Sequence, residues 1–353
     1  MPNMKQIARM AGVSLGTVSH VINNSARVRE PLRQRVLEAV DALRYQPSAL
    51  ARGLRRDKTN MIGMVIPDVT NPFFPAVVRG AEDTAFANGY RLVLCNTDNS
   101  HAKELEHLEQ LRTYLPAGLI IIPASFDKLS EEIESFRRSG AAVVFLDRIP
   151  RNWKGDSVTV SNNDGVFRAV EYLIQLGHER IACITGPLHL PNAQERLAGY
   201  KRALKLVGLS YPESYVREST FDRAGGYHDA LVLLRLRNRP TAILAQNDLM
   251  AMGTLLAIRE LQLRCPHDVS VIGFDDLDVT ELMDPPLASI RQSGYRMGAT
   301  AVQMLLDRVN GDEIGAAPGR HRVLETELRI RESVAPPSAA NRGKQQSRKR
   351  IRV

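Results

Sequence analysis

Polar and aromatic side chains, together with one glycine, follow several apolar stretches of the sequence at the positions where those stretches end. These residues are Asp68 with Asn71, Phe73 and Phe74; Asn96; Asp147; Gly186; Asn247 with Asp248; and Asp275 with Asp276. Carboxylates and amides bind hydroxyl groups in pairs, and aromatic rings cover the apolar face of a sugar. The set therefore predicts a binding site for a polyhydroxylated small molecule. Any one of these residues could instead cap a helix or shape a turn.

The N-terminal segment carries a different chemistry, because its pattern is helical throughout. Three short helices are predicted, over residues 5–11, 14–23 and 30–43, each with an apolar stripe at helical spacing. Ser14 is a natural N-cap for the second helix, and Pro31 suits the first turn of the third. Two short helices joined by a turn that contains Gly12 form the helix-turn-helix pattern, whose second helix enters the major groove of DNA.

The distribution of charge supports binding to a polyanion. The chain has 353 residues and a formal net charge of +8. Residues 1–60 contain eleven lysines and arginines against four acidic residues, and residues 336–353 contain six against none, so the long middle is net acidic. A basic module at one end of an acidic body is typical of a protein that binds nucleic acid. The basic tail could also be a solvated, disordered segment.

Beyond Asn60 the pattern changes to apolar strands that alternate with helical stretches. The strands are predicted in MIGMVIP, RLVLCN, GLIIIP, AVVFLD, SVTVS, RIACIT, AILAQN and SVIGFDD. Near-continuous apolar strands separated by helices indicate parallel sheets covered on both faces. The length predicts an α/β domain of two doubly wound lobes. Ligands of such sheets lie beyond the carboxyl ends of the strands, where the polar set described above would line a cleft between the lobes.

Other classes of protein are disfavoured by what the sequence lacks. No apolar stretch is long enough for a membrane span and no secretory signal precedes the first helix, so a cytoplasmic location without membrane partners is expected. Cys95, Cys183 and Cys265 are far apart, and no metal or cofactor motif is present. The run 12–16, GVSLG, fits the nucleophile elbow of hydrolases, but a helix instead of a strand precedes it. We therefore expect neither an enzyme nor a cofactor.

Many separate motifs in one order give the chain a family resemblance up to about residue 335. They are IARMAGVSLGTVSHVINN, PSALARGL, NPFF, GLIIIP, VVFLDR, LGHERIACITGP, ERLAGY, NDLMAMG, DVSVIGFDD and LDRVNGD. The sequence resembles the lac repressor and galactose repressor family of bacterial transcription regulators, with the N-terminal spacing of its purine-repressor branch. The resemblance implies an all-α helix-turn-helix DNA-binding domain, a hinge helix, a periplasmic-binding-protein-like effector domain and a homodimer on a pseudo-palindromic operator.

The resemblance also assigns residues to DNA. In the second helix it places Leu15, Gly16 and His20 at base-reading positions; Gly16 has no side chain, and Leu15 offers only apolar contact, for example with a thymine methyl. It places three phosphate contacts at Thr17, Ser19 and Asn23. In the hinge it assigns the minor-groove wedge, which kinks the duplex, to Leu54 and Arg55.

Effector contacts follow in the same way. The resemblance places five of them at Phe74, Arg196, Phe221, Asn247 and Asp275, with Asp147 and Asn162 as weaker candidates. Phe73, which belongs to the polar and aromatic set at the strand ends, is predicted to join them. Leu190 and Asn192 stand where purine-reading residues are found in the purine-repressor branch. Because Leu190 cannot make a polar contact, a purine effector is disfavoured and a sugar or sugar derivative is expected.

These observations predict a DNA-binding transcription regulator, a repressor controlled by a small-molecule effector. The predicted domains are residues 1–46 (helix-turn-helix), 47–59 (hinge), 60–335 (effector binding and dimerisation) and 336–353 (basic tail). The chain after Val334 lacks a leucine heptad, so a dimer is expected and not a tetramer. The sequence leaves open whether the effector induces or corepresses. The alternative is a sugar receptor of the periplasmic type that does not bind DNA.

Overall fold

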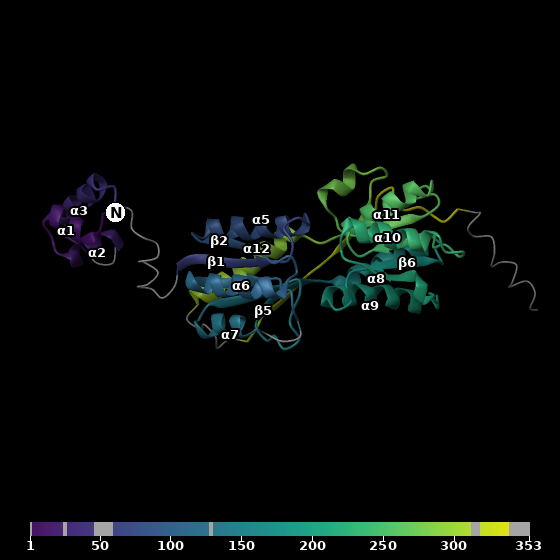
Figure 1. Cartoon of the computed structure of the whole chain (residues 1–353), viewed down its shortest axis with the longest axis horizontal. Coiled ribbons are helices and arrows are strands. Elements are labelled where there is room, and N and C mark those ends of the chain that lie inside the picture. Colours follow the sequence, from purple (N-terminus) through teal and green to yellow (C-terminus); the bar gives the residue numbers. More distant parts are fainter. Residues whose placement is uncertain (1, 24–26, 46–58, 127–129, 312–317, 339–353) are drawn as a thin grey trace, which may run out of the picture. The chain divides into compact units, whose positions relative to one another are not determined.

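The computed structural model describes residues 2–23, 27–45, 59–126, 130–311 and 318–338. The chain divides into two compact units, Met1–Asn60 and Met61–Val353 (Figure 1). The first unit is helical, and the second is built from strands that alternate with helices. Of the predicted hinge, residues 47–58 lie outside the described residues, as do residues 339–353 of the predicted tail.

The described residues of the first unit form three helices, α1 (Met4–Ala11), α2 (Leu15–Asn23) and α3 (Glu30–Ala42). Gly12 ends α1 in the left-handed region, with φ of 60°, which a glycine adopts without strain. Ser14 Oγ then accepts the Thr17 N–H at 3.1 Å and caps α2, and Pro31 lies in the first turn of α3. The predicted helices and their start signals are confirmed, with boundaries within one residue of those expected.

The second unit consists of two lobes, each built on a six-stranded sheet of described residues. In the first lobe the strand order is β11-β5-β4-β3-β1-β2. Its strands are β1 (Thr59–Ile66), β2 (Arg91–Asn96), β3 (Pro116–Ile121), β4 (Ala142–Leu146), β5 (Asp156–Val160) and β11 (His321–Leu324). Its helices are α5 (Phe73–Ala87), α6 (His101–Thr113), α7 (Glu131–Arg138) and α12 (Gly294–Asn310). Ile62, Met64 and Ile66 of β1 share a core cluster with α5 and α12, whereas Val65 belongs to a cluster with α6 and α7, so helices cover both faces.

In the second lobe the strand order is β12-β10-β9-β8-β6-β7. Its strands are β6 (Ile181–Thr185), β7 (Val216–Glu218), β8 (Ala242–Ala245), β9 (Ser270–Asp275), β10 (Ala288–Arg291) and β12 (Glu327–Arg329). Its helices are α8 (Asn162–Gln175), α9 (Pro191–Leu206), α10 (Arg223–Leu234) and α11 (Asp248–Glu260), with 3₁₀ turns η1 (Glu213–Tyr215) and η2 (Asp278–Leu282). Apolar residues of α8 and α9 pack on one face of this sheet and those of α10 and α11 on the other.

The chain passes between the lobes after β5, after β10 and after β11. As a result α12 and β11, late in the sequence, complete the first lobe, and α12 lies beside α5 (Figure 1). The predicted parallel pairing is confirmed except at one edge, where β12 pairs with β10 in antiparallel orientation. The sequence pattern does not reveal β7, β10, β11 and β12, because each has only three or four residues and includes an arginine, so none forms an apolar run. In the described parts of the chain, no helix combines the length and the apolarity that a bilayer span requires.

Candidate functional site

Residues at the carboxyl ends of strands from both lobes meet in the second unit. Asp147 directly follows β4 of the first lobe, and Asp275 ends β9 of the second. Asn192 in the first turn of α9 donates its side-chain amide to Asp147 Oδ2 at 3.0 Å, and this bond joins the lobes. We call Asp147, Arg148, Asn192, Arg196, Asp275 and Gln292 the interlobe site. All six are at least nine-tenths buried.

Arg196 has the most extensive set of contacts in this site. Its Nε donates to Asn162 Oδ1 at 2.8 Å, and its Nη1 donates to the Gln246 carbonyl oxygen at 2.6 Å. The guanidinium carbon lies 3.6 Å from the ring centroid of Phe274 and 6.0 Å from that of Phe221. Burial lowers the pKa of Arg196, and the carboxylates of Asp275 and Asp147 oppose this effect. The predicted donor Arg196 is therefore held rigidly, with two carboxylates close enough to affect it.

Asp275 is a buried acid in a strained backbone conformation. Its φ is 115°, in a region that side chains other than glycine rarely adopt, and its Oδ1 accepts from Gln292 Nε2 at 2.5 Å. Burial raises the pKa of Asp275 to about 7, although Arg196 and Gln292 act against it. Asp147 and Phe221 also have positive φ, of 62° and 61°. Strain of this kind costs about 1–3 kcal/mol per residue and is concentrated at functional sites.

Three buried polar atoms in the interlobe site have no hydrogen-bond partner among the described residues. They are Asp147 Oδ1, Arg148 Nε and Gln292 Oε1. Burying such atoms unpaired costs about 1–3 kcal/mol each, so native proteins rarely leave them so. Burial lowers the pKa of Arg148, and the nearby carboxylate of Asp147 opposes this effect. Within the described residues, two acceptors, Asp147 Oδ1 and Gln292 Oε1, are thus free to bind a ligand, and Arg148 Nε, which lies 3.7 Å from Asp147 Oδ2, lacks a hydrogen-bond acceptor.

The sequence analysis missed Arg148 and Gln292 as site residues. Arg148 is the second residue after β4, and Gln292 is the first residue after β10. The rule that ligands lie beyond the carboxyl ends of parallel strands applies to both positions. Gln292 cannot be recognised as a strand-end residue from the sequence, because the short strand β10 before it shows no apolar run. Arg148 stands one position beyond Asp147, the residue predicted at the end of β4.

Asn247 and Phe221 are joined by a hydrogen bond. Asn247 caps α11, because its Oδ1 accepts from the Met250 N–H at 2.8 Å, and its Nδ2 donates to the Phe221 carbonyl at 2.7 Å. Phe221 also packs on Leu190, which lies in a small apolar cluster with Phe126 and Ala193. Phe73 and Phe74 are buried at the start of α5 in edge-to-face contact, with ring centroids 5.2 Å apart.

Several of the polar residues at strand ends shape turns. Asp68 Oδ1 accepts from the Thr70 N–H at 2.8 Å, and Asn96 Oδ1 accepts from the Val69 N–H at 2.7 Å. Asn71 Oδ1 accepts from the Phe73 N–H at 3.1 Å. The alternative interpretation of these positions, as turn residues, therefore accounts for all three.

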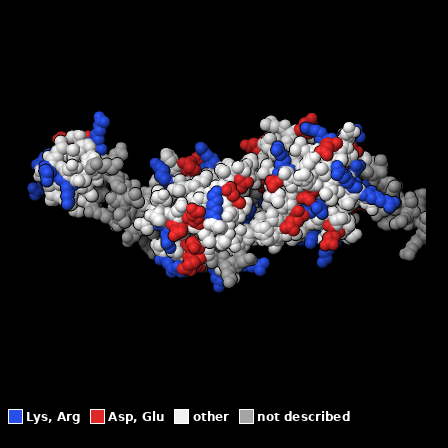
Figure 2. All heavy atoms as spheres, in the orientation of Figure 1, with Lys and Arg blue, Asp and Glu red and all other residues white. Residues whose placement is uncertain are grey.

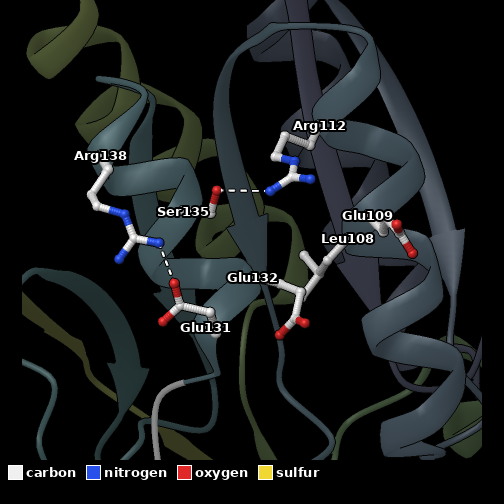
Figure 3. A pocket seen from close by; sticks show the side chains of 7 residues that line it. All are labelled: Leu108, Glu109, Arg112, Glu131, Glu132, Ser135 and Arg138. Atoms are coloured by element: carbon white, nitrogen blue, oxygen red, sulfur yellow. Dashed lines mark hydrogen bonds and ion pairs between the residues drawn. The ribbon is translucent and has the colours of Figure 1, made fainter.

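A surface hollow between α6 and α7 lies apart from the interlobe site (Figure 3). Six of its seven lining residues are polar or charged, and they are Glu109, Arg112, Glu131, Glu132, Ser135 and Arg138. Arg112 Nη1 donates to Ser135 Oγ at 3.0 Å, and Arg138 pairs with Glu131. These exposed partners satisfy one another, so the hollow lacks the unpartnered buried atoms that mark the interlobe site.

In the first unit, α2 presents the predicted DNA-reading residues to solvent. Leu15, Gly16 and His20 are exposed, whereas Ser19 is only 9% exposed. Thr17 is half-buried and its hydroxyl bonds Ser14 Oγ at 2.9 Å. Lysine and arginine side chains project from the visible face of this unit (Figure 2). The side chain of Asn23, and both hinge residues Leu54 and Arg55, lie outside what the structure describes.

Two family descriptions match the chain. Residues 3–48 match "Bacterial regulatory proteins, lacI family", and residues 170–334 match a "Periplasmic binding protein-like domain". The ribose operon repressor of Escherichia coli K12 is 40% identical over 311 residues, which are 88% of this chain and 93% of that protein. The chain belongs to the LacI family. The HTH-type transcriptional repressor PurR of Photobacterium profundum is 35% identical over 336 residues, which are 95% of this chain and 99% of that protein.

Solved LacI-family structures support the same conclusion. A lac repressor dimer bound to operator and the anti-inducer ONPF aligns with a TM-score of 0.82 and 28% identity, covering 95% of this chain and 99% of that one. A LacI-family regulator from Enterococcus faecium with bound ribose aligns with a TM-score of 0.70 and 29% identity, covering 79% and 100%. The chain is thus a LacI-family DNA-binding transcriptional regulator, and the resemblance, fold class and function predicted from its sequence are confirmed over the receptor alternative.

Proposed function

We propose that this LacI-family regulator is a repressor whose effector is a neutral aldose, with D-ribose as the first candidate, bound in the interlobe site. The observation that carries the proposal is the set of unpartnered buried atoms: Asp147 Oδ1 and Gln292 Oε1 need donors, and Arg148 Nε needs an acceptor. A hydroxyl group donates one hydrogen bond and accepts others, so a polyol satisfies all three. The named ribose repressor and the ribose-bound regulator support the choice of sugar.

The charges of the site favour an uncharged ligand. The guanidinium groups of Arg148 and Arg196 already have the carboxylates of Asp147 and Asp275 beside them. A phosphorylated sugar or a sugar acid would add a buried negative charge without a matching cation, and unpaired buried charge is costly. The apolar face of the sugar would be covered by Phe221, which packs over Arg196, and by the pair Phe73 and Phe74. Asn247 would bind a hydroxyl group of the sugar with its remaining amide hydrogen.

A thermal-shift and calorimetric series tests this proposal. D-ribose should raise the unfolding temperature progressively as its concentration increases, whereas ribose 5-phosphate and hypoxanthine should not. Stabilisation by hypoxanthine, in place of the sugar, would contradict the proposal and would favour a purine effector.

We propose that the protein acts on DNA by binding alone, without catalysis or a cofactor, in the cytoplasm. Leu15, Gly16 and His20 read bases in the major groove, where Gly16 allows close approach of the helix, while Thr17, Ser19 and Asn23 bind phosphates. Gel shifts with genomic fragments should recover a pseudo-palindromic operator. His20→Ala should weaken binding to that operator more than binding to a scrambled duplex, so the preference for the operator should fall.

The proposed domain plan follows the sequence. Residues 1–46 bind DNA, 47–59 form the hinge, 60–335 bind effector and dimerise, and 336–353 add non-specific DNA affinity. Leu54 with Arg55 wedges the minor groove from each subunit. Leu54→Ala should therefore weaken operator binding at a fixed salt concentration. Unchanged affinity would show that residues 47–59 act only as a linker.

We propose a homodimer as the working form. Exposed apolar side chains occur on α5 and β2 of the first lobe and on α11 and η2 of the second, and they are Phe86, Leu94, Leu256, Val279 and Leu282. Apolar side chains that form one contiguous patch would suit a partner surface, and the lac repressor dimer that aligns with this chain supports the proposal. Ligand binding between the lobes would favour one lobe arrangement and so change whether two hinges can pack on DNA.

A further inference from the structure

The turn that joins α1 to the recognition helix α2 leaves two backbone carbonyls for other partners. The last carbonyls of a helix have no partner within that helix. At the end of α1 the carbonyls of Ala8 and Arg9 accept from the N–H groups of Val13 and Gly12. The carbonyls of Ala11 and Gly12 lie in the turn that follows, shortly before Ser14, which caps α2.

Arg35 of α3 donates to both of these carbonyls. Its Nε lies 2.9 Å from the Ala11 carbonyl oxygen, and its Nη2 lies 3.0 Å from that of Gly12. A planar guanidinium presents its donors in a fixed fork, and a cation at a helix C-terminus is favoured by the helix dipole. The fork therefore ties α3 to the peptide units that lead into α2.

Gly12 fits this arrangement for two reasons. Its φ of 60° suits a glycine, and a Cβ at this position would stand 2.6 Å from Arg35 Nη2. The absence of a side chain thus leaves room for the guanidinium.

Apolar packing by itself fixes α2 only loosely. Among the described apolar side chains of α2, Val18 is fully buried, and Val21 and Ile22 are partly buried. Hydrophobic contact is non-directional, so it tolerates a small rotation or shift of the helix. Hydrogen bonds from a rigid fork to two carbonyls are directional, and they define where α2 begins relative to α3.

We propose that Arg35 is a positioning residue for DNA recognition, which sets the orientation of α2 without touching a base. The geometry that His20 needs for a base edge then depends on a side chain of another helix. Loss of the fork should reduce discrimination between sequences more than total DNA affinity, because phosphate contacts tolerate a displaced helix and base contacts do not.

Arg35→Lys in the full-length chain tests the proposal, because lysine keeps the charge and loses the fork. Arg33→Lys is the matched control: Arg33 is exposed on the same helix and makes no side-chain hydrogen bond in the part of the chain that the structure describes. The probes are the duplex that the parent protein selects from a random-sequence library and a scrambled version of it. Arg35→Lys should bind the selected duplex about tenfold or more weakly, with unchanged affinity for the scrambled duplex and an unchanged salt dependence. Arg33→Lys should match the parent on both.

Two outcomes of these titrations would overturn the proposal. One is parent-like binding of both duplexes by Arg35→Lys. The other is an Arg35→Ala variant that loses affinity for both duplexes equally, with a salt slope reduced by about one, which would identify Arg35 as a phosphate contact.

Amide hydrogen exchange in the free protein separates positioning from general stability. Arg35→Lys should accelerate exchange in residues 13–18 and leave α1 and the core of α3 protected. Equal acceleration in all three helices would mean that Arg35 only stabilises the unit, and the proposal would be wrong.

Discussion

The side-chain amide of Asn192 in the second lobe lies 3.0 Å from Oδ2 of Asp147 in the first, so a buried hydrogen bond joins the two lobes. The other oxygen of the same carboxylate, Oδ1, has no partner among the described residues. One carboxylate therefore holds the lobes together and retains an acceptor for a ligand. This division of roles leads to the first prediction.

Asn192→Ala should weaken binding of D-ribose by about fivefold to a hundredfold, because it leaves a buried charged acceptor unpaired at a cost of about 1–3 kcal/mol. Isothermal calorimetry measures the affinity. Asn163→Ala is the control, since the Asn163 amide bonds the Glu195 carbonyl within the second lobe. Equal affinities for the two variants would show that the bond between the lobes has no part in ligand binding.

Arg196→Ala should abolish the effector response and leave operator binding by the free protein intact. It should also lower the free energy of unfolding by about 1–3 kcal/mol, because Asn162 Oδ1 and the Gln246 carbonyl lose a buried donor. Arg202→Ala on the same helix removes an exposed pair with Asp164 and a cation–π contact with Phe167, whose ring centroid lies 4.2 Å away. It should leave the effector response unchanged and lower the free energy of unfolding by less than Arg196→Ala does. Operator gel shifts with and without D-ribose, together with thermal unfolding, check this. A parent-like response would mean that the site is misplaced.

Asp275→Asn should stabilise the ligand-free protein at pH 8 while it impairs the effector response. Burial raises the folded-state pKa of Asp275 to about 7, against roughly 4 in the unfolded chain. Burial of the Asp275 carboxylate therefore lowers the free energy of unfolding increasingly as the pH rises from about 4 to 7, and this loss of stability persists at higher pH. The unfolding temperature of the variant should exceed that of the parent at pH 8, and the difference should shrink at pH 5. A difference that grows towards acid would contradict the assignment.

Asp156→Asn should destabilise the first lobe at neutral pH. Burial raises the pKa of Asp156, but hydrogen bonds from Arg308 and Arg320 outweigh this and hold the pKa at about 2. The paired Asp156 carboxylate stabilises the folded protein by about 2 kcal/mol at pH values above its unfolded-state pKa near 4. This stabilisation is lost as the pH falls through the folded-state pKa of about 2. Urea unfolding of parent and variant at pH 7 and at pH 3 measures it. The difference should narrow at the lower pH, and a constant difference would assign the effect to packing.

The sequence by itself was sufficient for features that depend on local pattern. Ser14 and Pro31 marked helix starts that the structure confirms, because capping and proline geometry involve only residues a few positions apart. The apolar runs likewise identified the buried parallel strands, since a strand covered on both faces is apolar at nearly every position. The ordered motifs then indicated the family, which the comparisons confirm.

Tertiary structure decided which side chains meet. Gln292 follows β10, a strand of four residues that the sequence pattern does not reveal, and its side chain donates a hydrogen bond to Asp275 at the end of the adjacent strand β9. Arg35 is 24 residues from Ala11 in the chain and binds its carbonyl. The Asn192–Asp147 bond exists only because the chain passes between the lobes and returns. Residue type and local spacing determine what each element is, whereas hydrogen bonds between distant residues depend on how those elements pack, which no local pattern encodes.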